Sequence, residues 1–294
     1  MTVLAGILAD DGAVVAADTL MTTTNLGGGA VAGHQTKKIV AVLGGAFVIA
    51  LTGETGAGGR ICEKLQTHYK SGLGDTTVTA LEDHEYAKWL FRPVRNAATA
   101  DGVFLNGLAT RFAKAPESEA GRVAAFLSHA LRRRVGAGFA LLPRNGSALL
   151  ARFEGTDIVE VHRQDVEFAF LGSGQKEAEV FFHFLRTLLF PGRLPTLAQA
   201  EFAAYWSIQH CIDVNSQGVG GRPHLATLRH GDAAPSVLDE ARLSEHAEML
   251  KELRGRFAAQ FMDATRGVGD LGPIAAATGT LPSALKPDGG KSSE

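Results

Sequence analysis

Residues 2–18 read Thr-Val-Leu-Ala-Gly-Ile-Leu-Ala-Asp-Asp-Gly-Ala-Val-Val-Ala-Ala-Asp, and this stretch decides the fold class. Two apolar runs, at 3–9 and 13–17, flank the turn signal Asp10-Asp11-Gly12. Short apolar runs around an Asp-Gly pair are typical of a β-hairpin, so the two strands should be antiparallel. Neither run alternates with polar residues, so both faces of the hairpin should be covered. Two stacked sheets with helices outside them would cover both faces.

The same kind of pattern continues outward along the chain. A loop is predicted at 22–33, and a second hairpin is predicted around the Gly44-Gly45 turn. The remaining strands are predicted at 139–142, 148–154, 158–162, 166–171 and 224–230. The helices are predicted at 54–69, 119–135, 176–190 and 197–214. Because strands come in pairs and helices in pairs, the order differs from the alternation of a parallel α/β fold.

The character of the chain changes beyond residue 232. A charged amphipathic helix is predicted at 238–264, and Ser, Gly, Lys and Pro dominate from 282 onward, where we expect disorder. We therefore expect a first domain at 1–232 and a C-terminal helix with a disordered tail at 233–294. The first domain contains an enlarged region at about 71–118, in which short helical patches are interrupted by Pro and Gly.

Composition excludes several classes of function. Of 294 residues, 45% are hydrophobic and 20% charged, as in an ordinary globular protein, and the formal charge of −2 favours neither nucleic acid nor an anionic membrane as partner. Cys62 and Cys211 are too few for a disulfide framework and wrongly spaced for zinc, and the ten histidines form no ligand pair, so we expect no metal or cofactor. The start of the chain lacks the basic region of a signal peptide, and no apolar run reaches membrane-span length. A cytoplasmic location is therefore expected.

Three features near the N-terminus suggest chemistry: Thr2, Asp18 and the pair Lys37-Lys38. A threonine hydroxyl needs a base within hydrogen-bond reach, and a free α-amino group on the same residue can be that base. Thr2 would gain such a group if Met1 were removed, which its small side chain permits. Asp18 ends the strand beside Thr2, and a lysine from the next strand could lie between carboxylate and hydroxyl.

Each of these features also has an ordinary structural interpretation. Threonine is common at position two, and an aspartate after an apolar strand is usually a turn or surface residue. A lysine pair usually solvates a strand edge and protects it against aggregation. The order and spacing of the three features favour a shared site.

These residues resemble the proteasome β-subunit family of N-terminal-nucleophile hydrolases, which includes HslV and the bacterial homologue Anbu. The resemblance rests on residues 2–6 and 16–18, on 36–39, and on Leu51-Thr52-Gly53. It implies that Asp18 and Lys38 are the family's aspartate and lysine. It also implies that the Gly53 N–H forms part of an oxyanion hole.

Two later patches extend the resemblance. Gly172-Ser173-Gly174 is similar to the family's Gly-Ser-Gly segment, whose serine lies close to the nucleophile. Asp213 to Ser216, before Gly220-Gly221, is similar to the Asp-x-x-Ser-Gly-Gly segment that completes the site, although extra residues precede the glycine pair. Residues 215–223 also resemble the Asn-x-Ser-Val-Gly-x-Pro stretch of Anbu, and Gly218 stands here at the position of the serine. Two alignments of this segment therefore remain open.

The resemblance covers about 2–60 and 137–230 and implies a particular α+β fold. That fold is a four-layer αββα sandwich of two antiparallel sheets between helices, the N-terminal-nucleophile hydrolase fold. The chain departs from the family in three ways: the long region 71–118, the absence of an arginine that many relatives carry just after the Asp18-Thr19 pair, and a C-terminal helical extension similar to that of Anbu.

The resemblance implies a threonine-type peptidase that cleaves peptides or unfolded proteins through an acyl-enzyme. Thr2 would be the nucleophile, oriented by Asp18 and Lys38, while Ser173, Asp213 and Ser216 would support its amine. Family members form rings, so a homo-oligomer is expected, and whether an ATPase partner is needed stays open. Two alternatives remain: an amidase or acylase that uses Thr2 on a small molecule, and a non-catalytic ring subunit that retains Met1.

Overall fold

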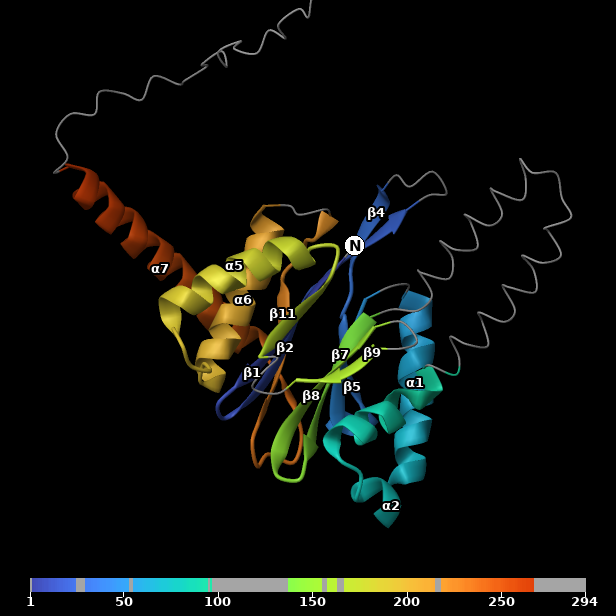
Figure 1. The fold of residues 1–294 in the computed structure, drawn as a ribbon. Coiled ribbons are helices and arrows are strands. Elements are labelled where there is room, and N and C mark those ends of the chain that lie inside the picture. Colours follow the sequence, from blue (N-terminus) through green and yellow to red (C-terminus); the bar gives the residue numbers. More distant parts are fainter. Residues whose placement is uncertain are drawn as a thin grey trace, which may run out of the picture. The chain divides into compact units, whose positions relative to one another are not determined.

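The computed structural model describes residues 2–24, 30–52, 55–94, 96, 137–154, 158–162, 167–214 and 218–266. The chain divides into two compact units, Met1–His246 and Ala247–Glu294. In the first unit two five-stranded antiparallel sheets lie face to face, with helices outside each of them (Figure 1). The predicted αββα sandwich is thereby confirmed. The domain division at 232 stays a prediction, and the predicted helix at 119–135 and the tail from 282 lie outside the described residues.

The first sheet is built around the hairpin that the opening residues predict. Its strand order is β10 (Phe168–Gly172), β1 (Val3–Ala9), β2 (Gly12–Asp18), β11 (Pro223–Arg229) and β12 (Ser236–Val237). In the hairpin Leu4 pairs with Ala17 and Ala9 with Gly12, and every residue of β2 is buried. The hairpin and the cover on both of its faces are confirmed. The absence of polar alternation was therefore a correct indicator of a strand between two apolar layers.

The second sheet contains the remaining hairpins. Its order is β5 (Ile39–Val42), β6 (Phe47–Leu51), β7 (Ala137–Arg144), β8 (Ser147–Glu154) and β9 (Ile158–Val161), with a short 3-10 turn, η1 (Leu43–Gly45), between the first two strands. Alternate residues of the two sheets meet in one apolar layer, which includes Leu4, Val15, Val48, Phe139 and Leu171. Burial of this layer is the main force that holds the sheets together.

Helices cover the outer face of each sheet (Figure 1). On the first sheet lie α5 (Gln175–Leu189) and α6 (Leu197–Asp213), close to the predicted bounds. The second sheet is covered by α1 (Thr55–Gly72), α2 (Thr76–Thr79) and a helical stretch at 83–94. The apolar layer beneath these last three includes Phe47, Ile49, Leu65, Leu90 and Phe153.

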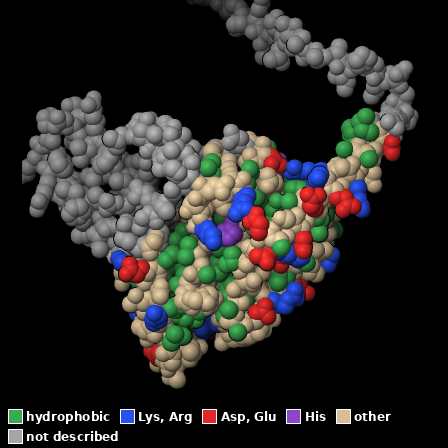
Figure 2. Space-filling model, turned by 180° about the vertical axis from the view of Figure 1, so that it is seen from behind, with side chains coloured by type: hydrophobic (Ala, Val, Ile, Leu, Met, Phe, Trp, Pro, Cys, Tyr) green, Lys and Arg blue, Asp and Glu red, His purple; other side chains and the backbone are tan. Residues whose placement is uncertain are grey.

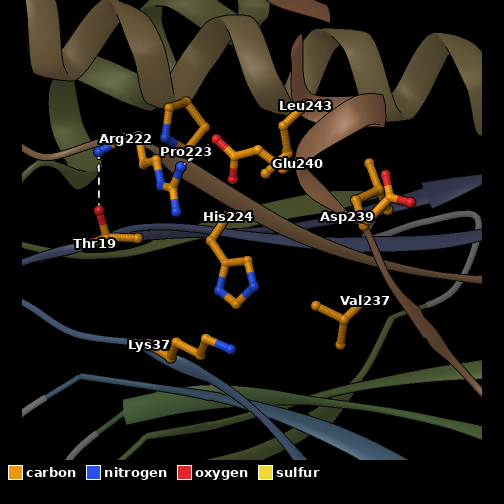
Figure 3. Close-up of a pocket in the computed structure, with 10 residues that line it drawn as sticks. Thr19, Lys37, Arg222, Pro223, His224, Val237, Asp239, Glu240 and Leu243 are labelled. Atoms are coloured by element: carbon orange, nitrogen blue, oxygen red, sulfur yellow. Dashed lines mark hydrogen bonds and ion pairs between the residues drawn. The ribbon is translucent and has the colours of Figure 1, made fainter. Parts of the chain in front are cut away.

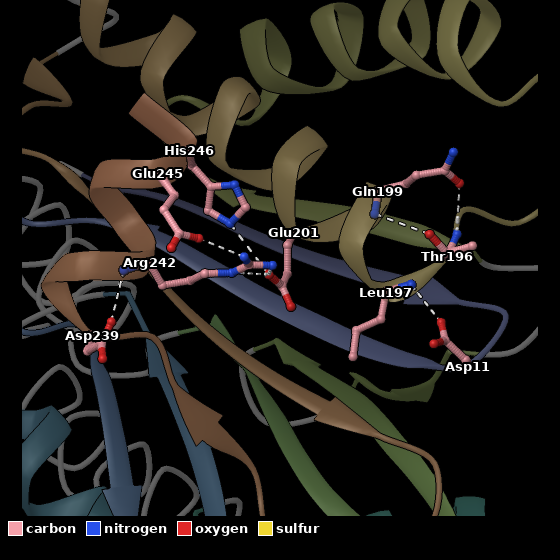
Figure 4. Close-up of polar contacts among 9 residues, drawn as sticks. All are labelled: Asp11, Thr196, Leu197, Gln199, Glu201, Asp239, Arg242, Glu245 and His246. Atoms are coloured by element: carbon pink, nitrogen blue, oxygen red, sulfur yellow. Dashed lines mark hydrogen bonds and ion pairs between the residues drawn. The ribbon is translucent and has the colours of Figure 1, made fainter. Parts of the chain in front are cut away.

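Local polar contacts fix the start of α6 (Figure 4). The Thr196 and Gln199 side chains each accept from the other residue's backbone N–H, forming a capping box. Asp11, in the turn between β1 and β2, accepts from the Leu197 N–H at 2.6 Å. Because unpaired N–H groups at a helix start need acceptors, the tip of the first hairpin is tied to α6.

One predicted loop is wrong. Residues 22–24 fall instead within β3 (Leu20–Thr24) and residues 30–33 within β4 (Ala30–Gln35), and the two strands pair antiparallel as a separate two-stranded ribbon. Residues 25–29 lie outside the described residues. Threonine is β-branched and suits an extended backbone, so the threonines at 22–24 favour a strand. The glycines in this stretch had led to the loop prediction.

The last described helix is α7 (Glu240–Arg266), predicted at 238–264. No helix among the described residues is long and apolar enough to cross a membrane. On the face drawn in Figure 2, basic and acidic side chains lie interspersed, which matches the near balance of 29 basic and 31 acidic residues.

Candidate active site

Thr2 lies directly before β1 and is buried. The turn between β10 and α5 holds its backbone: the Thr2 N–H donates to Ser173 Oγ at 3.2 Å, and the Gly174 N–H donates to the Thr2 carbonyl at 3.3 Å. The Ser173 hydroxyl also donates to that carbonyl, at 3.4 Å. The fold therefore brings together Thr2 and Ser173, which are 171 residues apart in the chain. The resemblance implied that this serine lies close to Thr2.

Gly172 allows this close approach. Its φ is +95°, which side chains rarely permit, and a Cβ built there would lie 2.2 Å from the Thr2 carbonyl oxygen. Only glycine tolerates both the left-handed backbone and the short distance without a shift of Thr2. The position of Thr2 thus depends on a residue with no side chain.

Asp18 is fully buried at the end of β2 and is surrounded by hydrogen-bond donors. Its Oδ1 accepts from Lys38 Nζ at 2.6 Å and from the Val3 N–H at 2.9 Å, and its Oδ2 accepts from the Gly220 N–H at 3.3 Å. A buried carboxylate requires such partners because it has lost its hydration. One Asp18 oxygen therefore links Lys38 to the peptide group between Thr2 and Val3.

Lys38 precedes β5 and is buried. Burial lowers the pKa of Lys38 below its ordinary value of 10.5, while the charge of Asp18 and the hydrogen bond to it act in the opposite direction. A lysine with a lowered pKa is more readily deprotonated than a surface lysine and can take part in proton movement. Its backbone is also fixed, because the Leu51 N–H donates to the Lys38 carbonyl at 3.1 Å.

Three further site residues were predicted: Asp213, Gly53 and Ser216. Asp213 is the last residue of α6, is exposed, and accepts from Gln209 Nε2 at 2.6 Å. Gly53 and Ser216 lie outside the described residues. Their roles stay predictions.

The contribution of the 218–222 segment was only partly foreseen. Its glycine pair was noted as a motif, but the contact of the Gly220 N–H with Asp18 was not predicted. The Arg222 N–H also donates to Thr19 Oγ1 at 2.9 Å, and the Leu20 N–H donates to the Gly220 carbonyl at 2.9 Å. Each of these contacts uses a backbone N–H and joins residues at least 200 positions apart, and no sequence pattern marks which acceptor a distant N–H will reach.

The fold therefore holds the Lys38 amine, the Asp18 carboxylate and the backbone of Thr2 together in a buried site. Within the ranges that the structure describes, no group of three or more His, Cys, Asp or Glu side chains is placed to hold a metal ion. The side chains gathered here can take part in proton transfer and nucleophilic attack.

No protein-family model matches the chain, and none of the curated proteins is similar to it in sequence. Solved structures do share its fold. Anbu from Hyphomicrobium sp. strain MC1 is similar with a TM-score of 0.57 at 16% identity, over 87% of this chain and 97% of that one. Anbu (ancestral beta-subunit) from Yersinia bercovieri is similar with a TM-score of 0.58 at 13% identity, over 88% and 97%. At such identities the likeness establishes a proteasome-like N-terminal-nucleophile hydrolase fold and no more.

Proposed function

We propose that this protein is an N-terminal-nucleophile amide hydrolase of the threonine type, which cleaves peptide bonds after removal of Met1. The observation that carries the proposal is the carboxylate of Asp18, shared by Lys38 Nζ and the amide next to Thr2. Burying an ion pair at this point is unfavourable unless the pair is fully satisfied. Its position beside Thr2, which would become an N-terminal nucleophile on removal of Met1, favours a catalytic role.

The nitrogen of Thr2 already has a suitable partner. The bond from Thr2 N to Ser173 Oγ is made by a peptide N–H in the unprocessed chain. Removal of Met1 would convert the same nitrogen into an α-amine, and the Ser173 hydroxyl would then orient that amine. An α-amine has a reference pKa near 8, which suits a general base at neutral pH.

The proposed reaction has two halves. The Thr2 hydroxyl proton passes to the α-amine as Oγ bonds to the carbonyl carbon, and the carbonyl π electrons move to its oxygen. The oxyanion collapses, the C–N bond breaks, and the leaving nitrogen takes the proton from the α-ammonium group. Water then attacks the ester in the same way, which releases the acid and regenerates Thr2. Lys38 and Asp18 stabilise the developing charges throughout, and the Gly53 N–H is the expected oxyanion donor.

The test is the intact mass of the purified protein before and after incubation with a threonine-directed epoxyketone or β-lactone. We expect loss of one Met residue and gain of one probe mass. Thr2→Ala should lose Met1 as well, because alanine is also small, but should gain no probe. Thr67→Ala, which removes an exposed hydroxyl on α1, is the matched control and should label fully.

Probe incorporation that Thr2→Ala leaves unchanged would refute the assignment of the nucleophile. Labelling by a small amide-like probe without cleavage of peptides would instead indicate an amidase or acylase. Retention of Met1 with no labelling would support a non-catalytic subunit.

We also propose that the chain self-assembles through α5. Val180, Phe184 and Leu188 recur every four residues, so they share one face of the helix, and they are 68%, 56% and 46% exposed. An exposed apolar stripe of this kind is typical of an interface with another protein surface. Phe184→Glu should lower the mass measured by light scattering, whereas Lys176→Glu, a charge reversal at the start of α5, should not.

A further inference from the structure

A pocket of about 220 Å³ opens on the side of the first unit where β11 and the residues before β5 approach each other (Figure 3). Lys37, His224 and Arg222 line it, together with Thr19 and with Asp239 and Glu240 from the start of α7. Thr19 and Lys37 directly follow and precede Asp18 and Lys38 in the chain. The pocket is smaller than the roughly 300–1,000 Å³ typical of sites for drug-sized ligands, so it suits a small group.

His224 is the unusual residue of this pocket. It alternates along β11 with residues that face the helices, and it shares the inter-sheet side with Ala226 and Leu228. Its exposed fraction is 9%, and its Nδ1 has no hydrogen-bond partner among the described residues. A buried imidazole nitrogen without a partner is unfavourable, because the desolvation of that nitrogen is uncompensated. Figure 3 shows the ring directed into the pocket, between Lys37 and Arg222.

Two cations, Lys37 and Arg222, and two carboxylates, Asp239 and Glu240, line the pocket around His224, and both carboxylates already have partners. Glu240 forms an ion pair with Arg222, and Asp239 Oδ1 accepts from the Arg242 N–H at 2.9 Å. Lys37 makes no ion pair within the described part of the chain, and its amine points toward the same space as the imidazole (Figure 3). The two carboxylates are thus already engaged, whereas one ammonium group and one imidazole nitrogen are not.

We propose that this pocket binds a small oxyanion, a carboxylate or a phosphate group, held by Lys37 and His224. The anion would supply an acceptor to Lys37 and, once His224 is protonated, to the imidazolium. Arg222 adds a second positive charge at the rim while keeping its pair with Glu240. The inference is independent of any role of Thr2, since Lys37 and His224 lie outside the Asp18–Lys38 cluster.

Binding should be coupled to uptake of a proton. Burial lowers the pKa of His224 below its ordinary value of 6.5, and the positive charges of Lys37 and Arg222 lower it further. A bound anion offsets both charges and therefore raises that pKa toward the neutral range. By linkage, the anion should bind more tightly below the raised pKa and more weakly as the pH rises through it. The negative charges of Asp239 and Glu240 act against binding of an anion.

The test is an NMR titration of the histidine Cε1–H resonances, with the full-length protein, at constant ionic strength. Inorganic phosphate and N-acetylglycine serve as separate probes of a phosphate and of a peptide-like carboxylate. We expect one resonance, which His224→Gln removes, to shift with one of these anions, and its pKa to rise as the anion is added. Lys37→Ala should raise the Kd for that anion about tenfold, because one charged contact is lost.

The matched control is Lys70→Ala, which removes an exposed lysine on α1 and should leave the titration unchanged. A response to phosphate alone would assign a phosphate ligand, and a response to N-acetylglycine alone would assign a carboxylate. The proposal is overturned if neither anion shifts the His224 resonance, or if Lys37→Ala and Lys70→Ala weaken binding equally. Because the readout is binding, failure of peptide cleavage would not affect it.

Discussion

Two buried carboxylates of the first unit, Asp18 and Glu201, are held in different ways. Asp18 lies at the end of a strand and pairs with a buried lysine and two backbone N–H groups. Glu201 lies on α6 and pairs with Arg242 and His246 of α7, as Figure 4 shows. The Arg242 side chain is half exposed, whereas the Lys38 side chain is buried.

The Asp18–Lys38 and Glu201–Arg242 ion pairs are suited to different roles. Between two helices, a carboxylate with an exposed arginine fastens one element to another, and water shares in its solvation. Between two sheets, a carboxylate with a buried lysine has lost water on all sides, so the ion pair is retained at a higher cost. Such a cost is typical of functional sites.

The largest effect should follow Asp18→Asn. The substitution leaves the Lys38 ammonium buried without its counter-charge, so unfolding free energy should fall by about 3–5 kcal/mol. Urea denaturation at neutral pH measures the change, and probe labelling of Thr2 should be lost. The double variant Asp18→Asn with Lys38→Met should recover part of the stability but none of the labelling. If the double variant is no more stable than the single one, the buried charge is not the cause.

A smaller effect should follow Gly172→Ala. The new Cβ would approach the Thr2 carbonyl at 2.2 Å, so Thr2 must shift and labelling should fall sharply, alongside about 1–3 kcal/mol of backbone strain. Gly192→Ala is the matched control, because Gly192 also has a positive φ, +70°, but has nothing within 4 Å of its Cβ position. That control should lose similar stability and label normally. Equal loss of labelling in both variants would contradict a positioning role for Gly172.

Glu201→Gln should be milder and should spare the site. Removing the charge weakens the hydrogen bonds from Arg242 and the electrostatic contact with His246, so we expect a loss of about 1–3 kcal/mol. Labelling of Thr2 should stay at the wild-type level. If labelling fell as much as in Asp18→Asn, the two carboxylates would not be functionally distinct.

The smallest expected effect is the pH dependence of the unfolding free energy, for which the direction of change is the test. Burial raises the pKa of Glu201, but the hydrogen bonds and charges of His246 and Arg242 outweigh it, so that pKa lies below 4.5. Its contribution is therefore present above about pH 4.5 and is lost as the pH falls through the folded pKa. For Lys38 the slope has the same sign but falls in the alkaline range: its pKa is lowered, so the unfolded chain binds more protons between that value and 10.5. Stability should rise with pH through that window.

Urea denaturation across pH, with Glu201→Gln and Lys38→Met as references, measures the two contributions separately. The difference between wild type and Glu201→Gln should shrink only on the acid side. The difference between wild type and Lys38→Met should change only on the alkaline side. A Lys38 contribution that decreases as the pH rises would mean that Asp18 outweighs burial.

Much of the framework could be predicted from local pattern. The runs at 3–9 and 13–17 predicted a hairpin covered on both faces, and β1 and β2 are that hairpin. The sequence predicted that Lys38 could lie near Asp18, but the ion pair joins the end of β2 in the first sheet to the start of β5 in the second, so it depends on how the two sheets stack. The loop predicted at 22–33 was wrong at 22–24 and 30–33, because glycine and threonine give opposing local signals and pairing between β3 and β4 decided between them.

The sequence by itself determined the αββα layers, the place of Thr2 at the start of a buried strand, and the carboxylate and lysine available to it. Those features follow from the spacing of apolar residues and from the turn residues between them, which are patterns among residues close together in the chain. Only the tertiary structure decided that Gly220 reaches Asp18, that Asp213 is exposed, and that His224 shares a pocket with Lys37. These contacts join residues far apart in the chain, and their geometry depends on how the sheets and helices pack, which no local pattern encodes.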